Sequence, residues 1–244
     1  MRTAFALAPL LALAACGGGD AASNSAAPAA PVAAVTPPAG QQWTDVVSKT
    51  AEGGFRMGNP DAPIKLVEFG SRTCHVCAEF DEQGLEPLKA NYISTGKVSY
   101  EFRDYLRNGA DLGAALLGAC GGPGTFFPIL DQMMRAQEGT LETLQALPES
   151  FYAQLEGLPP AQQTARYAEA AGYVDFIKQR GIPEPQARQC LADVAAAETL
   201  TKSTQSATEE YAIPGTPTFL INGSVVDNTV NWTQLEAALK RAGA

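Results

Sequence analysis

Apolar residues recur along this chain with two different spacings, and the change of spacing marks the predicted elements. Residues 64–69 form a mostly apolar run, which predicts a buried strand. Residues 97–103 alternate apolar with polar positions and predict a second strand. Between them, residues 76–88 carry apolar side chains at helical spacing, although Gly84 and Pro87 would weaken or kink such a helix. The order strand, helix, strand predicts a βαβ unit with parallel strands.

The middle of the chain, residues 108–211, has helical periodicity throughout. We expect helices over 112–119, 126–137, 161–180, 185–192 and 195–211. A block of about a hundred residues is far longer than the loops of compact domains. It is therefore predicted to be a helical insertion subdomain.

Strand signals return in residues 212–244. Residues 217–221 and 224–226 flank Asn222-Gly223, which is a strong hairpin signal. Asn231, followed three residues later by Gln234, predicts the start of a final helix.

The first half of the fold is predicted over residues 43–107, where a short helical lead-in at 43–48 and an edge strand at 54–58 precede the βαβ unit. The expected fold class is α/β, with a βαβ half and a ββα half separated by the helical insertion.

Residues 1–15 have the pattern of an export signal. Arg2 is followed by an apolar segment, 4–13, that is too short to span a bilayer. It ends at Leu13-Ala14-Ala15-Cys16, which resembles the lipobox of bacterial lipoproteins. That resemblance implies cleavage before Cys16 and lipid attachment to it. The alternative is an ordinary signal peptide that happens to precede a cysteine. Either route exports the chain to a compartment where disulfides persist.

Residues 16–42 are rich in Gly, Ala, Ser and Pro and are predicted to be a flexible tether. About 26 residues of this kind give a reach of roughly 25–30 Å, which would keep the domain near a membrane.

Composition changes this picture little. Hydrophobic residues make up 45% of the 244-residue chain, enough for a packed core, and 17 basic against 26 acidic side chains give a net charge of −9. The sequence has no basic cluster, which argues against nucleic acid as a partner.

The candidate chemistry lies in Cys74-His75-Val76-Cys77, a C-x-x-C pair at the start of the helix that follows the first buried strand. Unpaired backbone N–H groups and the helix dipole favour negative charge there, so the pKa of Cys74 should fall, and the thiolate is the nucleophile. Cys77 lies one turn deeper and can resolve a mixed disulfide. The pair predicts redox chemistry that needs no cofactor beyond its own disulfide.

Two other interpretations of the pair remain open. Zinc would need two more ligands at paired spacing, whereas the single histidine, His75, lies inside the motif. An inert structural clip is the second. If Cys16 carries lipid, four cysteines remain, so Cys120 and Cys190 could form a second disulfide, although they could also be two separately buried thiols.

A βαβ unit with C-x-x-C at its helix start, followed by a hairpin and a closing helix, resembles the thioredoxin fold. The helical insertion makes the chain similar to the DsbA-like thiol-disulfide oxidoreductases over about residues 51–242. This resemblance implies a cis peptide bond at Thr216-Pro217, facing the redox disulfide and binding substrate backbone. It also matches Glu68, an acidic residue beneath the active site. Glu68 could relay a proton for Cys77, or it could lie at an exposed edge.

The chain departs from the family's best-known oxidases, which carry Pro-His where this chain has His75-Val76. Thr216 also occurs in isomerases and reductases, so the direction of the reaction stays open. His75 is still expected to stabilise the Cys74 thiolate. The segment 17–50 is too short for the dimerisation domain of the isomerases, which favours a monomer.

Three functions therefore compete. The first is an exported, lipid-anchored oxidase that acts on folding envelope proteins and is re-oxidised by a membrane partner of the DsbB type. The second is a reductase or isomerase supplied by a reductant donor. The third is a non-catalytic peptide-binding chaperone. The expected location is the periplasmic side of the bacterial envelope, on the inner or the outer membrane.

Overall fold

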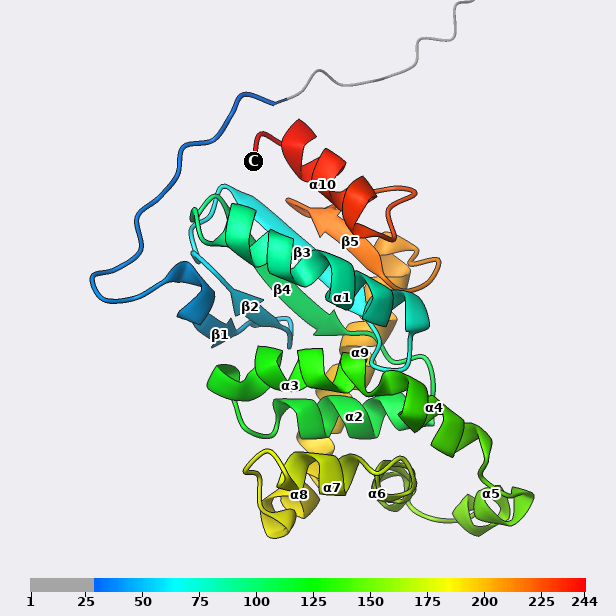
Figure 1. The fold of residues 1–244 in the computed structure, drawn as a ribbon. Helices are drawn as coiled ribbons and strands as arrows, with labels where there is room; N and C mark the ends of the chain where they lie inside the picture. The colour runs from blue at the N-terminus through cyan, green and yellow to red at the C-terminus, as the bar shows by residue number, and fades with distance from the viewer. Residues whose placement is uncertain (1–28) are drawn as a thin grey trace, which may run out of the picture.

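The computed structural model describes residues 29–244. The predicted signal peptide, Cys16 and the first part of the tether therefore lie outside the described residues. The fold is built on one mixed sheet with the strand order β1-β2-β4-β3-β5-β6 (Figure 1). The strands are β1 (Val47–Lys49), β2 (Phe55–Met57), β3 (Ile64–Gly70), β4 (Val98–Asp104), β5 (Thr218–Ile221) and β6 (Ser224–Val225).

Helices cover both faces of this sheet and extend beyond one edge of it (Figure 1). The helices are α1 (His75–Leu88), α2 (Gly109–Ala119), α3 (Pro123–Arg135), α4 (Gln137–Gln145), α5 (Glu149–Leu155), α6 (Pro160–Ala170), α7 (Tyr173–Lys178), α8 (Glu184–Leu191), α9 (Val194–Tyr211) and α10 (Trp232–Arg241). The region 108–211 is helical as predicted, and α4 and α5 are additions that the sequence did not indicate.

The predicted parallel pair forms the centre of the sheet. β3 pairs with β4 in parallel from Ile64↔Val98 to Gly70↔Asp104, and β5 pairs antiparallel with the other side of β3. Alternation along β3 directs Val67 and Phe69 toward a cluster with Ala207 of α9. The intervening positions face α1, which brings the strand's carboxyl end and the helix start together.

The helical insertion and the sheet share one hydrophobic core, so the insertion is not a detached subdomain. Phe126 of α3 stacks on Phe55 of β2 with ring centroids 3.9 Å apart, and it also packs against Phe102. A second apolar cluster lies wholly within the insertion, between α2, α3 and α6 to α8. Because aromatic burial contributes about 3–5 kcal/mol per side chain, Phe126 fixes the position of the insertion against the sheet.

Two predicted elements differ from the structure. The single helix expected over 161–180 is two helices, because Gly172 between them has φ 74°, a left-handed conformation that interrupts the helix. The lead-in at 43–48 is a 3₁₀ turn followed by β1, and β1 therefore forms the edge in place of β2. The helix predicted over 76–88 is α1, and the chain continues from it into a widened turn at Lys89–Ile93.

The described part of the predicted tether is bound to the fold and does not hang free. Ala29 and Val32 donate backbone hydrogen bonds to the carbonyls of Arg241 and Gly243, and Val35 donates to Thr95. The indole of the buried Trp43 then donates to the carbonyl of Val35 over 2.7 Å. Composition alone could not predict this, because the contacts are made by backbone groups. Among residues 29–244, no helix combines the length and hydropathy needed to cross a membrane.

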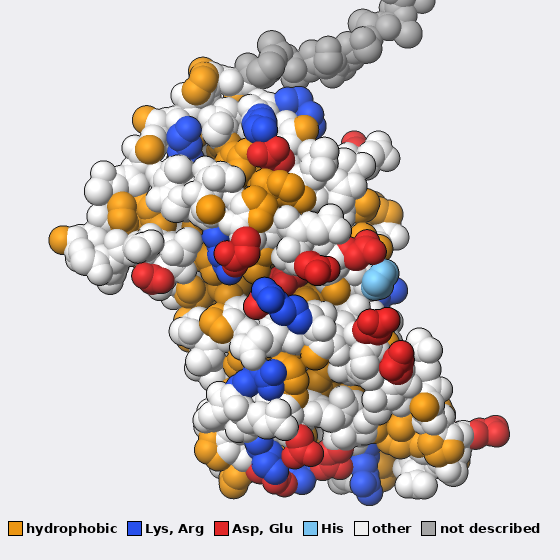
Figure 2. Space-filling model, in the orientation of Figure 1, with side chains coloured by type: hydrophobic (Ala, Val, Ile, Leu, Met, Phe, Trp, Pro, Cys, Tyr) orange, Lys and Arg blue, Asp and Glu red, His pale blue; other side chains and the backbone are white. Residues whose placement is uncertain are grey.

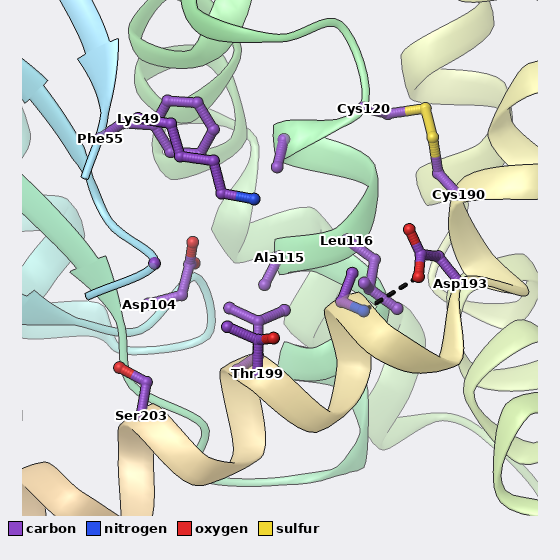
Figure 3. A pocket seen from close by; sticks show the side chains of 14 residues that line it. Lys49, Phe55, Asp104, Ala115, Leu116, Cys120, Cys190, Asp193, Thr199 and Ser203 are labelled. Carbon is purple, nitrogen blue, oxygen red and sulfur yellow. Dashed lines mark hydrogen bonds between the residues drawn. A yellow bond between two sulfur atoms is a disulfide. The ribbon is translucent and has the colours of Figure 1, made fainter. Parts of the chain in front are cut away.

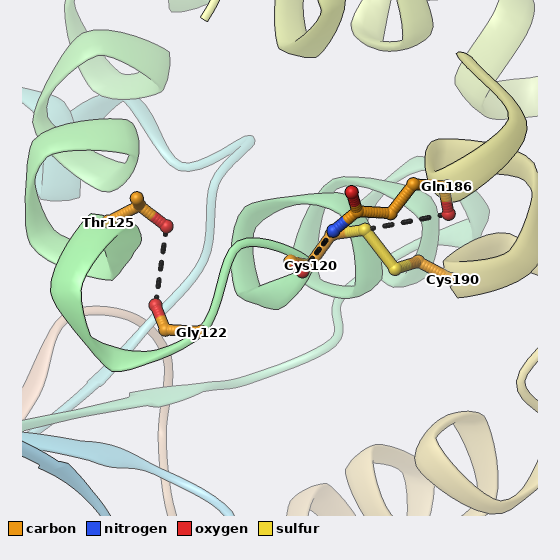
Figure 4. Close-up of a disulfide and its surroundings, with 5 residues drawn as sticks. All are labelled: Cys120, Gly122, Thr125, Gln186 and Cys190. Atoms are coloured by element: carbon orange, nitrogen blue, oxygen red, sulfur yellow. Dashed lines mark hydrogen bonds between the residues drawn. A yellow bond between two sulfur atoms is a disulfide. The ribbon is translucent and has the colours of Figure 1, made fainter. Parts of the chain in front are cut away.

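Cys120 and Cys190 form a disulfide, as the cysteine count suggested (Figure 4). Their Cα atoms are 5.8 Å apart, within the usual range for such a bond. The bond joins the end of α2 to α8, and the amide of Gln186 donates to the carbonyl of Cys120 at 3.2 Å. Two helices far apart in the sequence are thereby held side by side.

Replacing both cysteines, as Cys120→Ser with Cys190→Ser, should lower the free energy of unfolding. The disulfide closes a loop with a sequence separation of 70, and the chain-entropy relation gives about 4 kcal/mol for it. Urea denaturation of the two proteins, with Cys74 and Cys77 unchanged in both, measures the difference. A difference below about 1 kcal/mol would contradict a stabilising role.

Candidate active site

The two motif cysteines lie at the connection between β3 and α1. Cys74 is the N-cap residue of α1, with an extended backbone (φ −96°, ψ 114°), and Cys77 lies in the first helical turn. Both side chains are buried and both are free thiols in this structure. The N-terminal N–H groups of α1 are therefore directed at the region of the Cys74 sulfur, where negative charge is favoured.

The surroundings of Cys74 stabilise its thiolate. Its pKa falls from 9.0 to about 5, chiefly through a hydrogen bond with the Cys77 side chain, with further help from the Thr216 side chain and the Cys77 backbone. In the thiol form, Sγ donates to the carbonyl of Thr216 over 3.1 Å. The Thr216–Pro217 bond is cis, as the resemblance implied. The site thus brings together Cys74 and Thr216, which are separated by 142 residues of chain.

Cys77 has the opposite electrostatic setting. Burial raises the pKa of its thiol well above 9.0, and the nearby Cys74 and Glu68 reinforce that rise. At neutral pH, Cys74 is then the thiolate and Cys77 the protonated thiol. This asymmetry fits an attacking cysteine followed by a resolving one.

Glu68 lies inside the molecule, so the interpretation as an exposed edge residue is wrong. Its side chain is on the α1 face of the central strand and is 1% exposed. Burial raises the pKa of this carboxyl to about 8, although the hydroxyl of Tyr100, which donates to Oε2 at 2.7 Å, opposes the rise. A carboxyl that is protonated near neutral pH and lies close to Cys77 can give up or accept a proton there.

The side chain of His75 makes its contact with Glu79, although the residue is next to Cys74 in the sequence. Its imidazole is exposed and forms a pair with Glu79, one turn further along α1, at 3.1 Å. The hydrogen bonds that lower the pKa of Cys74 come from Cys77 and Thr216, and the contributing cation is Arg107. Val76 is partly buried against the core. Sequence reasoning missed Arg107 because it follows β4, about thirty residues from the motif.

Residues of the insertion hold the loop that precedes Cys74. The carboxylate of Asp111, on α2, accepts hydrogen bonds from the Ser71 hydroxyl at 2.9 Å and from the Thr73 backbone N–H at 3.1 Å. Asn108, the N-cap of α2, donates to the Thr73 hydroxyl at 2.8 Å. No local pattern in the sequence indicates this contact between α2 and the redox loop.

A buried ion pair holds the same loop from beneath. The Arg72 side chain has no exposed surface, and its Nε donates to Asp104 at the end of β4 over 2.7 Å. Its guanidinium also lies 5.2 Å from the ring centre of Phe126. Gly118 on α2 faces this group so closely that any side chain would collide with it. The position two residues before Cys74 is therefore fixed by charge and packing.

A cavity of about 200 Å³ lies between β2, α2 and α9 (Figure 3). The cavity is lined by Lys49, Asp104, Thr199 and the disulfide, rather than by Cys74 or Cys77.

A different pocket, of about 240 Å³, opens beside the motif between His75, Glu79, Arg135 and Glu138. Figure 2 shows the single histidine, in pale blue, among acidic side chains. Within residues 29–244, no group of three or more His, Cys, Asp or Glu is placed to bind a metal ion.

A family model described as Thioredoxin matches residues 50–241. The chain belongs to the thioredoxin family. The part that matches includes the sheet, the redox motif, the helical insertion and the cis-proline loop.

Comparisons with individual proteins indicate a narrower class within this family. A solved structure titled protein-disulfide isomerase, from Novosphingobium aromaticivorans, is 30% identical, covers 75% of this chain and 94% of that one, and superposes with a TM-score of 0.72. Alpha-DsbA1 of Wolbachia pipientis shares the fold at 20% identity, covering 77% of this chain and 89% of that one, with a TM-score of 0.59. A Rickettsia bellii protein named "Putative protein-disulfide oxidoreductase" is 27% identical over 81% of this chain.

The predicted resemblance to the DsbA-like thiol-disulfide oxidoreductases is therefore confirmed. This chain spans 67%, 60% and 64% of the length of three Rickettsia relatives. These relatives are longer than this chain, so their names describe whole proteins of which this chain matches only a part.

Removing the acidic partner of Arg72, as Asp104→Ala, should destabilise the protein strongly. The change leaves a buried, unpaired guanidinium, which costs about 3–5 kcal/mol. The control is Glu198→Ala, which breaks an exposed pair with Lys202 of 3.5 Å and should change stability by no more than about 0.5 kcal/mol. Equal unfolding free energies for the two variants would contradict the role of the buried pair.

In the reduced protein, the absorbance at 240 nm should report the titration of the Cys74 thiol, with a midpoint near pH 5. Cys77→Ala removes the main hydrogen bond, so the midpoint for Cys74 should rise to between about 6 and 7. The pKa of the Cys74 thiol is lower in the folded than in the unfolded protein. Ionisation of Cys74 therefore stabilises the reduced form fully above about pH 9, and this stabilisation is lost as the pH falls through about 5. An unchanged midpoint in Cys77→Ala would contradict this assignment.

Proposed function

We propose that this protein is an exported, lipid-anchored thiol-disulfide oxidoreductase whose main task is to oxidise dithiols of folding envelope proteins. The observation that carries the proposal is the stabilised Cys74 thiolate beside the Thr216–Pro217 loop, with Cys77 protonated behind it. A couple whose reduced form is stabilised in this way is oxidising.

The reaction starts from the Cys74–Cys77 disulfide. A client thiolate attacks Sγ of Cys74, the bond between the two protein sulfurs breaks, and Cys77 leaves and takes a proton from the Glu68 carboxyl. A second client thiolate then attacks the client sulfur of the mixed disulfide, and Cys74 departs as its stable thiolate. The client gains a disulfide and loses two electrons, while the protein becomes the dithiol.

Client binding is assigned to the surfaces on either side of Cys74. The backbone next to Thr216 is available to an extended client chain, as the family resemblance implies. Beyond it lies a pocket of about 450 Å³ lined partly by apolar side chains, among them Pro214, Val226 and Val230. Partly folded proteins, which expose apolar segments beside their cysteines, fit such a surface.

We infer the setting of this reaction from the N-terminal sequence. We place the domain on the periplasmic side of the bacterial envelope, attached through lipid on Cys16 to the inner or outer membrane and acting as a monomer. A membrane partner of the DsbB type would re-oxidise the dithiol. The lipobox-like pattern supports this placement, together with the disulfide between Cys120 and Cys190, which suits an oxidising compartment.

A reductase or isomerase is the second candidate. It is favoured by the Novosphingobium relative, whose title names a protein-disulfide isomerase, and by Thr216 before the cis proline. In that direction the Cys74 thiolate attacks a client disulfide and Cys77 resolves the mixed disulfide, with electrons from a reductant donor. A non-catalytic chaperone is a third candidate, distinguished by full activity without either motif cysteine.

Equilibration against glutathione buffers, with a reduced client refolded in parallel, tests the proposed direction. We expect a reduction potential of roughly −120 to −230 mV and net oxidation of the client. A value near roughly −270 mV, the thioredoxin level, would overturn the oxidase and favour the reductase. His75→Ala should make the couple more reducing if the imidazole stabilises the Cys74 thiolate, and it should leave the potential unchanged if the ring acts only on Glu79.

A further inference from the structure

One side chain crosses from the helical insertion into the redox loop and touches the backbone of the nucleophile itself. Gln137 is the first residue of α4, directly after Ala136, where the chain turns between α3 and α4. The residue is 3% exposed. Its Nε2 donates to the carbonyl of Arg72 at 3.1 Å and to the carbonyl of Cys74 at 3.0 Å.

These two contacts fix the peptide group between Arg72 and Thr73 and the one between Cys74 and His75. The Cys74 carbonyl also accepts the first intrahelical bond of α1, from the N–H of Ala78 at 3.1 Å. Gln137 therefore holds the N-cap residue in the orientation that directs the helix N-terminus at Sγ. The groups that lower the pKa of Cys74, on Cys77 and Thr216, act only while Sγ keeps its place between them.

The contacts also act through charge. A carbonyl oxygen carries partial negative charge, and the carbonyl of Arg72, two residues before Cys74, would lose its Gln137 donor. Unpaired acceptors of this kind are costly, and they disfavour a neighbouring anion more than a neutral thiol. Losing the Gln137 amide therefore penalises the thiolate selectively.

We propose that Gln137 is a positioning residue that stabilises the Cys74 thiolate through the loop backbone and makes the Cys74–Cys77 couple more oxidising. The inference rests on the proposed function and deepens it, because it assigns the tuning of the redox couple to the helical insertion.

Three variants in the full chain test this proposal. Gln137→Met keeps the unbranched shape and removes the donor. Gln137→Glu replaces the donor by an acceptor of equal size. Gln137→Lys keeps a donor on an unbranched stem. Gln145→Met, at the exposed far end of the same helix, controls for the chemical change alone.

The readouts are the glutathione equilibrium constant and the pKa of Cys74, measured beside urea unfolding of each variant. Gln137→Met and Gln137→Glu should favour the disulfide form about tenfold more than the original chain, which corresponds to about 30 mV toward reducing potentials. The pKa of Cys74 should rise by about one in both. Gln137→Lys should stay at the original potential or become more oxidising, and Gln145→Met should not move it.

Loss of stability in Gln137→Met and Gln137→Glu with an unchanged potential and pKa would overturn the proposal, since a merely structural contact predicts that result. An equal reducing shift in Gln137→Lys would overturn it as well, because the donor is retained there. The reduction potential of the unaltered chain tests the proposed function separately from the role of Gln137. If that chain already lies near the thioredoxin potential, the oxidase is wrong, whereas the difference between the variants still tests Gln137.

Discussion

A thiolate inside a folded protein persists only where donors and positive potential surround it, and in this chain that condition depends on the conformation of four residues, 71–74. The start of α1 provides the potential, but the loop decides whether the Cys74 sulfur lies within it. Contacts from Asp104, Asp111, Asn108 and Gln137 hold that loop. Since α2 and α4 belong to the insertion, the insertion is part of the redox site.

Burial gives the two cysteines different roles within one helical turn. Cys77 and Glu68 lie deep enough that their charged forms are disfavoured, whereas Cys74 has hydrogen bonds that outweigh its own desolvation. The result is a site in which one sulfur is charged and a proton is held nearby. Two such cysteines can take up two electrons when their disulfide is reduced to the dithiol and give them back when the disulfide forms again.

Local patterns were sufficient to predict the sheet, the motif and the closing hairpin from the sequence. The C-x-x-C spacing, the strand alternation around Glu68 and the Asn222-Gly223 turn are signals carried by neighbouring residues. What the sequence did not indicate depends on partners distant in the chain. Arg107 and Gln137 reach the loop from segments whose packing no local pattern encodes. The helix break at Gly172 was missed because apolar periodicity continues across it.

The hydrogen bonds of Ala29, Val32 and Val35 determine where the chain's N-terminal end leaves the fold. They lie by Thr95 and the last turn of α10, at the end of the sheet where β3 and β4 begin (Figure 1). The redox loop is at the other end of β3, about 20 Å away for a seven-residue strand. Residues 29–35 and the redox loop therefore lie at opposite ends of the central strand, so a contact made with one leaves the other uncovered.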